Sequence, residues 1–121
     1  MSSGEDRWTP EVLKERLGGD EQLVRELVRI FLVEYPALLQ AVGIPVACGD
    51  MAGIRRASHA LRGAIANFID DGPTSTALAL ERAAGDVRPG DVAGLAGQLT
   101  QEVEALAAAM RRFNGVDPCA S

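Results

Sequence analysis

Apolar residues near the C-terminal end of the chain recur at alternating steps of four and three positions. This spacing places them on one side of an α-helix and is typical of a helix in an antiparallel bundle. The stripe consists of Val92, Ala96, Leu99, Val103, Leu106, Met110 and Phe113. No segment of the sequence shows the strict apolar–polar alternation of a half-buried strand. The chain is therefore expected to fold from helices alone.

Typical helix-starting and helix-ending residues predict two helices in the first part of the chain. Thr9 and Pro10 are expected to start a short helix that stops at two glycines, and Asp20 is expected to cap a second helix. The apolar stripe of the second helix comprises Leu23, Val24, Leu27, Val28, Phe31, Tyr35 and Leu38. Pro36 is expected to kink this helix, and a loop containing Pro45 is expected over residues 43–49.

Three more helices are expected in the remainder of the chain. Asp50 is expected to cap a helix that runs to about residue 71, Thr74 to cap the next, and Asp91 to cap the last, after a loop over residues 87–90. Short connections make consecutive helices antiparallel neighbours. The expected fold is therefore an all-α, antiparallel up-down four-helix bundle with a short additional N-terminal helix. We place this domain at residues 9–114, between a flexible N-terminus (1–8) and a flexible C-terminal tail (115–121).

Length and charge narrow the possible functions. The 121 residues fit one domain, and a net charge of -5 argues against a nucleic-acid partner. The polar, acidic N-terminus does not resemble a secretory signal, and no apolar run approaches the roughly 18 residues of a membrane span. Cys48 and Cys119 are expected to be separate reduced thiols. We expect a cytoplasmic protein without a membrane partner, and Met1 and the polar ends favour a free-standing one.

His59 is the only histidine in the chain, and its helix is expected to present it to solvent. A lone histidine on a helix is more often an ordinary surface or half-buried residue than a functional group. Its position on the helical wheel helps to distinguish the two cases. At about 100° per residue, the predicted core face lies opposite His59. That core face consists of Ile54, Ala57, Leu61, Ala64, Ile65 and Phe68. His59 is therefore not expected to be a core residue.

The residues that surround His59 on its helix are suited to binding an anion on the imidazole. Gly63 lies one turn later on the same face, where it costs up to about 1 kcal/mol of helix stability relative to Ala and leaves room for a partner. Arg55 and Arg62 lie at neighbouring helical positions and supply cations for an anion held on the imidazole, whereas Arg56 is interpreted as an ordinary solvated side chain. A neutral imidazole with these neighbours is suited to attack an acyl phosphate and become phosphohistidine.

The sequence around His59 resembles the histidine-containing phosphotransfer (HPt) domain family. The family motif of His, any residue, Leu, Lys, Gly and small residues is matched by HALRGAIANF at residues 59–68. DEQLVRELVRIF at residues 20–31 resembles the first bundle helix of the family, and ALALERAA at residues 77–84 resembles its alanine-rich helix. The sequence departs from the family at Arg62, where Lys is commoner, at Ile65, where a small polar residue is usual, and at Ile69, where Gly is usual.

The resemblance implies a phosphorelay intermediate that carries a phosphoryl group on His59 to and from aspartates of response-regulator receiver domains. A hybrid sensor kinase is a further expected partner. The carrier itself is expected to be a monomer without autokinase activity and without a cofactor. Arg62 is expected to stabilise the phosphoryl group and Gly63 to give steric access. Residues expected to contact the partner are Ala52, Arg55, Ala66 and Asn67.

Three other interpretations of His59 remain. The phosphoacceptor domain of a sensor histidine kinase also exposes a histidine on a bundle helix, but it typically has an acidic residue next, where this chain has Ala60. A metal site is disfavoured because no other ligand lies at suitable helical spacing from His59. The third alternative is a non-catalytic helical adaptor, in which His59 is incidental. Incubation with a phosphorylated receiver domain distinguishes this alternative from the phosphocarrier.

Overall fold

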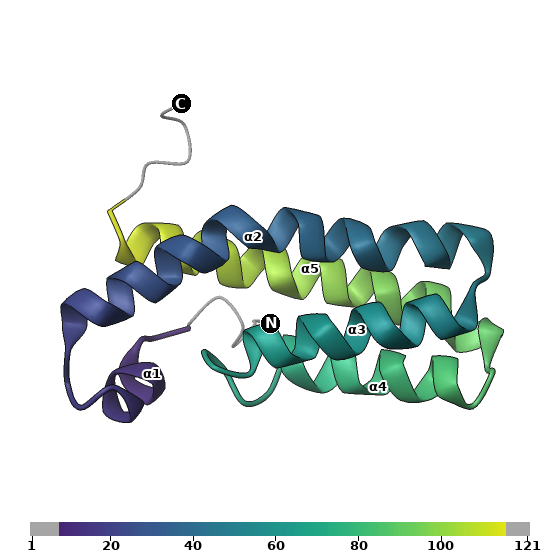
Figure 1. Ribbon diagram of the computed structural model, residues 1–121, viewed down its shortest axis with the longest axis horizontal. Helices are drawn as coiled ribbons and strands as arrows, with labels where there is room; N and C mark the ends of the chain where they lie inside the picture. Colours follow the sequence, from purple (N-terminus) through teal and green to yellow (C-terminus); the bar gives the residue numbers. More distant parts are fainter. Residues whose placement is uncertain (1–7, 116–121) are drawn as a thin grey trace, which may run out of the picture.

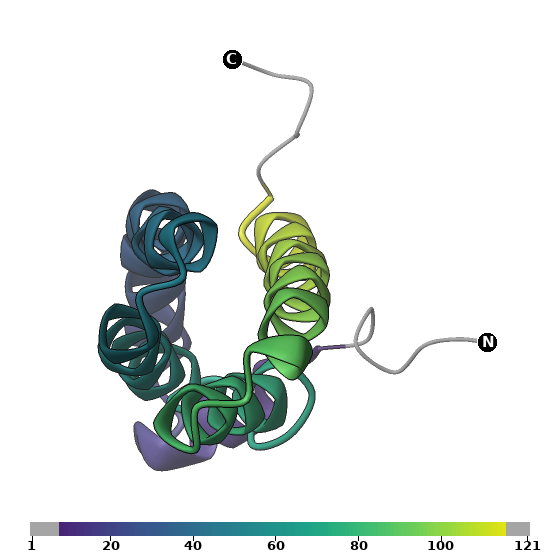
Figure 2. The same cartoon turned by 90° about the vertical axis from the view of Figure 1, so that its right-hand side faces the viewer.

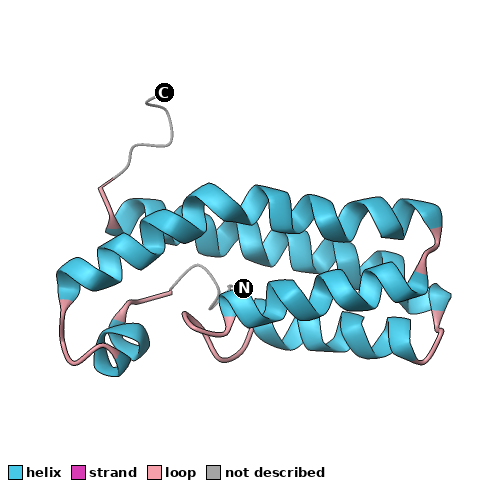
Figure 3. Cartoon of the chain, viewed as in Figure 1, coloured by secondary structure: helices cyan, strands magenta, loops and turns pink. Residues whose placement is uncertain are grey.

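The computed structural model describes residues 8–115, and every element of regular structure in that range is a helix (Figure 3). The helices in chain order are α1 (Glu11–Arg16), α2 (Glu21–Cys48), α3 (Met51–Ile65), α4 (Pro73–Gly85) and α5 (Pro89–Phe113). The all-α prediction and the short leading helix are confirmed.

The four longer helices lie lengthwise beside one another (Figure 1) and surround a common centre when viewed along their axes (Figure 2). Each packs against the next helix in the chain, and α2 also packs against α5, so α3 and α5 occupy diagonal positions. The buried side chains between them include Val24, Val28, Phe31, Tyr35, Ile54, Leu61, Ile65, Leu80, Leu99, Val103, Leu106 and Met110. The apolar stripe predicted for the last helix accordingly faces this core.

α2 is one continuous helix through Pro36 and Pro45, and it ends at Gly49, whose φ of 70° is readily adopted by glycine. The expected kink or end of a turn at Pro36 does not stop the helix, and the expected loop around Pro45 is wrong. Each internal proline removes a backbone hydrogen bond and disfavours the helix locally. Tyr35 and Val42 are buried in the core from this segment, and their packing outweighs the local preference.

The length of α2 also corrects the expectation that no apolar segment approaches a membrane span. By length and composition alone, α2 could cross a bilayer, with a mean hydropathy of 1.6 over its most apolar window. That criterion is weak, because core helices and signal sequences also meet it. In this fold α2 contributes Val24, Val28 and Phe31 to the core and packs against α3 and α5.

Two of the predicted helix caps are correct. The Asp20 carboxylate accepts a hydrogen bond from the backbone N–H of Leu23, and the Asp50 carboxylate accepts one from the backbone N–H of Gly53, each at 3.0 Å. Both satisfy donors that the first turn leaves free. Asp50 thereby fixes the beginning of α3.

The other predicted caps are wrong. Thr9, Thr74 and Asp91 do not cap; the capping positions are Pro10, Gly72 and Arg88. Pro73 and Pro89 occupy the first turns of α4 and α5, where a missing N–H costs nothing, so α5 starts inside the loop expected over residues 87–90. The Thr74 hydroxyl instead donates to the carbonyl of Ile69 at 2.7 Å, and Asp91 pairs with Arg88 at 2.8 Å.

α3 ends at Ile65, earlier than the expected end near residue 71, and donors from the N-terminal segment cover its C-terminal end. The Arg16 guanidinium donates to the carbonyls of Ala66 and Asn67, at 3.2 and 3.3 Å, and the Trp8 indole N–H donates to the carbonyl of Phe68 at 2.9 Å. Assigning Trp8 to a flexible N-terminus was therefore wrong. Of the tail expected at 115–121, residues 116–121 lie outside the described range.

Candidate functional site

α3 presents His59 to solvent from the middle of the helix. Ile54, Leu61 and Ile65 are fully buried on the opposite side of α3, and the Ser58 hydroxyl is satisfied by the carbonyl of Ile54 at 2.6 Å. The His59 side chain is 65% exposed. The helical periodicity of the sequence predicted this orientation correctly.

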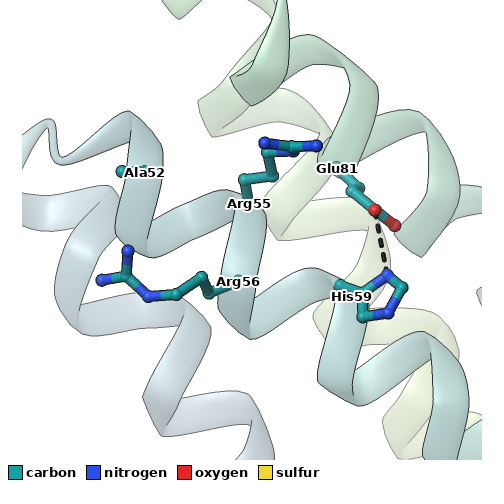
Figure 4. Close-up of a pocket in the computed structure, with 5 residues that line it drawn as sticks. All are labelled: Ala52, Arg55, Arg56, His59 and Glu81. Atoms are coloured by element: carbon teal, nitrogen blue, oxygen red, sulfur yellow. Dashed lines mark hydrogen bonds and ion pairs between the residues drawn. The ribbon is translucent and has the colours of Figure 1, made fainter.

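A carboxylate from α4 contacts the imidazole. Glu81 Oε2 lies 3.0 Å from His59 Nδ1, and in Figure 4 the second ring nitrogen lies on the side of the ring away from Glu81. The helix that carries His59 has no carboxylate of its own, so spacing within that helix did not predict this contact. The Glu81 side chain is only 16% exposed, so the packing of α4 against α3 fixes its position.

Arg62 completes a three-residue cluster. Its Nε lies 3.1 Å from Glu81 Oε1, and its Nη2 lies 3.1 Å from His59 Nδ1. A guanidinium only donates hydrogen bonds and an ionised carboxylate only accepts them, so Nδ1 can serve only one of the two. We assign the Nδ1 proton to the Glu81 contact, since a carboxylate facing a nitrogen lone pair at 3.0 Å would be repelled. Nε2 is then the nitrogen with a free lone pair.

Glu81 is ionised at neutral pH. Burial disfavours its charged form, but hydrogen bonds from His59 and Arg62, together with the Arg62 charge, outweigh burial and lower the pKa of Glu81 below the usual 4.5. An ionised Glu81 can accept a hydrogen bond from the Nδ1–H group of His59 but cannot donate one to Nδ1.

Gly63 and Gly53, both in α3, occupy contrasting surroundings. A Cβ built at Gly63 meets no atom within 4 Å, so the turn after His59 is open. A Cβ at Gly53 would lie 2.6 Å from an Asp50 carboxylate oxygen and 3.0 Å from the Cβ of Pro45. Gly53 therefore permits the close crossing of α2 and α3, a role that sequence reasoning missed. Gly63 has no such packing role.

A surface pocket adjoins the imidazole and contains part of the predicted partner surface. It is lined by Ala52, Arg55, Arg56, His59 and Glu81 (Figure 4). Of the other residues predicted to contact a partner, Ala66 and Asn67 lie beyond the end of α3, where their carbonyls are bound by Arg16. The structure does not bring these two into the pocket.

Sequence reasoning missed Glu81 and underrated Arg56. Glu81 is the only carboxylate of α4, and a single acid in an alanine-rich helix next in sequence to the histidine helix was the available signal. Which side of α4 faces α3 depends on the packing of the two helices, and spacing within one helix does not report it. Ile69, another departure from the family pattern, lies half-buried in the turn before α4.

Comparison with known families identifies the family of this chain. The model of the Hpt domain matches residues 26–109, which include His59, Arg62 and Glu81. The chain belongs to the Hpt domain family. Hpt domains are phosphocarriers of two-component signalling rather than enzymes, and they interact with response-regulator receiver domains. No curated protein and no solved structure matches the chain. In this Hpt domain, the matched region excludes α1 and Trp8, which cover the end of the histidine helix.

Proposed function

We propose that this Hpt domain is a phosphorelay intermediate that carries the phosphoryl group on His59 Nε2, to and from receiver aspartates. The observation that carries the proposal is the contact of an exposed His59 with Glu81 through Nδ1, at 3.0 Å. This contact favours the tautomer that carries its proton on Nδ1. The nucleophilic lone pair is then on Nε2, the ring nitrogen on the side away from Glu81.

The transfer step needs no proton acceptor. The Nε2 lone pair forms a bond to phosphorus while the bond from phosphorus to the aspartate oxygen breaks, and aspartate leaves as a carboxylate. The imidazole keeps its Nδ1 proton and becomes a cationic phosphoimidazolium ring. The ionised Glu81 stabilises that cation, and return of the phosphoryl group to a second aspartate reverses the same bonds.

Arg62 and Gly63 have distinct roles in this proposal. The Nη2 group of Arg62, released from Nδ1 by the tautomer assigned above, turns to the phosphoryl oxygens while Nε stays on Glu81. The open surface at Gly63 admits the receiver close to Nε2. Glu81 lies on the Nδ1 side with both oxygens engaged, so it does not activate water beside Nε2, and the phosphorylated form is expected to hydrolyse slowly.

The proposal also covers the helix topology, the oligomeric state, the location and the phosphoryl donor of the protein. We propose that α2 to α5 form the expected antiparallel up-down bundle, that the protein acts as a cytoplasmic monomer without autokinase activity, and that a hybrid sensor kinase supplies the phosphoryl group. Light scattering at micromolar concentration tests the monomer: a stable dimer would contradict it.

Phosphoryl transfer from a receiver domain tests the function directly. A receiver domain charged with acetyl phosphate is incubated with the parent protein and with His59→Gln. We expect acid-labile, base-stable phosphorylation of the parent protein and none of the variant, with identical circular dichroism spectra. Phosphorylation of His59→Gln at the parental rate would contradict the assignment. If no receiver domain and no phosphoramidate phosphorylates the parent protein, the adaptor interpretation replaces the phosphocarrier.

A further inference from the structure

The charges of the protein are unevenly distributed among its helices. α3 contains three arginines and no acidic residue, whereas each of the other helices contains at least one carboxylate. The whole chain has a net charge of -5, and α3 contributes +3, so the remaining residues together carry -8. His59 therefore lies on a cationic strip of an otherwise acidic protein.

Three arginines near His59 have no acidic partner. Arg55 and Arg56 of α3 and Arg82 of α4 are exposed, and none forms an ion pair with any residue in the range 8–115. Five other arginines are paired: Arg16 with Asp70, Arg25 with Glu21, Arg29 with Glu26, Arg62 with Glu81, and Arg88 with Asp86 and Asp91. Arg111 and Arg112 also form no ion pair with any residue in the range 8–115, but they lie near the end of α5, the helix diagonal to α3. The charges of the three are thus available to another molecule.

The three arginines surround two adjoining pockets. Arg55 and Arg56 line the pocket that contains His59, and Arg55 and Arg82 line a second one between α3 and α4. The two carboxylates that also line the second pocket have other partners: Glu81 pairs with His59 and Arg62, and Asp86 pairs with Arg88. Arg55 extends over the end of α4, where a Cβ at Gly85 would lie 3.6 Å from its Cδ and Nε. Figure 4 shows Arg55 and Arg56 leaving α3 in different directions beside the imidazole. A partner that reaches His59 therefore meets cations on more than one side.

We propose that Arg55, Arg56 and Arg82 form a docking surface for a receiver domain that is acidic around its phosphorylated aspartate. This inference rests on the proposed function and adds the charge of the partner. Complementary charges raise the rate of encounter and orient two proteins, and like charges suppress wrong partners. The acidic remainder of the chain repels such a receiver and the arginine surface attracts it, so encounters at His59 are favoured over those elsewhere. A long polyanion such as a nucleic acid fits less well, because it would extend beyond the three arginines onto acidic surface.

Charge reversal with a matched control tests the docking surface. Arg55→Glu, Arg56→Glu and Arg82→Glu are compared with Arg112→Glu, which makes the same change of charge at an exposed position of α5, the helix diagonal to α3. The probe is a receiver domain with an acidic surface, charged with acetyl phosphate, and the readout is kcat/KM for transfer to His59. We expect each of the three variants to lower kcat/KM roughly tenfold at low salt and Arg112→Glu to change it less than about twofold.

Salt dependence and a small donor complete the experiment. Raising salt from about 0.1 M to about 1 M shortens the Debye length from roughly 10 Å to roughly 3 Å, and the difference between the variants and the parent should shrink accordingly. Equal losses in Arg112→Glu, no loss in the three variants, or a loss independent of salt would overturn the inference. So would oligonucleotide binding that the three substitutions abolish while transfer stays unchanged. Phosphoramidate is a small phosphoryl donor that needs no docking surface. If it fails to phosphorylate the parent protein, the proposed function is wrong. If it succeeds, a negative result with the receiver domain contradicts only the docking surface.

Discussion

Glu81 Oε2 lies 3.0 Å from His59 Nδ1 across the interface between α3 and α4. The same carboxylate binds Arg62 Nε through its other oxygen, at 3.1 Å. Glu81 therefore joins the imidazole to the nearest cation and restricts the orientation of both. The buried side of α4 determines the position of Glu81, so the packing of two helices sets the chemistry of one exposed ring.

Removing Glu81 should change the tautomer of His59. In Glu81→Ala we expect the Nε2–H form to gain population, because Arg62 can then donate to Nδ1 without competition. Phosphoryl transfer should slow at least about tenfold, the equivalent of one charge-assisted hydrogen bond. Glu81→Gln keeps an acceptor for Nδ1–H and should retain more of the rate. Nitrogen chemical shifts of the ring report the tautomer, and an unchanged tautomer in Glu81→Ala would refute the assignment.

The Glu81 carboxyl should titrate below 4.5, because its hydrogen bonds with His59 and Arg62 outweigh the opposing effect of burial on its pKa. A depressed pKa in the folded state stabilises the fold above the unfolded value, and this contribution is lost as the pH falls through the folded pKa. A carbon-detected titration of Glu81 gives the midpoint directly. Arg62→Ala should raise it, and a midpoint of 4.5 or above in the parent protein would contradict the proposed cluster.

Two substitutions of Arg62 should distinguish the effect of its positive charge on phosphoryl transfer from the effect of its guanidinium geometry. We expect Arg62→Ala to slow transfer or shorten the lifetime of the phosphorylated state, because the phosphoryl oxygens lose their nearest cation. Arg62→Lys keeps the charge and should retain most of the transfer rate, although a lysine ammonium cannot reproduce the two-pronged hydrogen bonding of a guanidinium. Single-turnover transfer and the decay of phosphohistidine measure the two effects. Equal values for Arg62→Ala and the parent would reduce Arg62 to a structural partner of Glu81.

Gly63→Ala should stabilise the protein by up to about 1 kcal/mol, because the added methyl meets open space and alanine favours a helix. Transfer from a receiver should nevertheless slow, and a larger side chain should slow it further, because it occupies the surface that the receiver approaches. Chemical denaturation and transfer rates measure the two changes in the same variant. Parental rates with a bulky residue at Gly63 would show that the open turn is not used.

Gly53→Ala should have the opposite effect on stability. The added methyl would press on Asp50 and Pro45, and overpacking of this kind typically costs about 1–3 kcal/mol, more than the gain in helix propensity. Because Gly53 and Gly63 lie in one helix and receive the same substitution, each is a control for the other in denaturation experiments. A stabilised Gly53→Ala would mean that α2 and α3 separate there at little cost.

The features that were predictable from the sequence are those that depend on one helix at a time. The exposure of His59 followed from the spacing of Ile54, Leu61 and Ile65, and the caps at Asp20 and Asp50 from local hydrogen bonding. Local rules failed where packing between helices decides the outcome, as in the continuation of α2 through its prolines. They failed for Glu81 for the same reason, because its meeting with His59 requires the relative rotation of two helices.

The hydrogen bonds from Trp8 and Arg16 to the chain after α3 bear on how this protein should be truncated. A fragment cut at residue 26, where the family match begins, would lose both donors and leave the carbonyls of Ala66, Asn67 and Phe68 without these partners. The end of the histidine helix would then exchange its amide hydrogens faster than in the full chain. A fragment that keeps these two hydrogen-bond donors therefore begins before the residues matched by the family, at or ahead of Trp8.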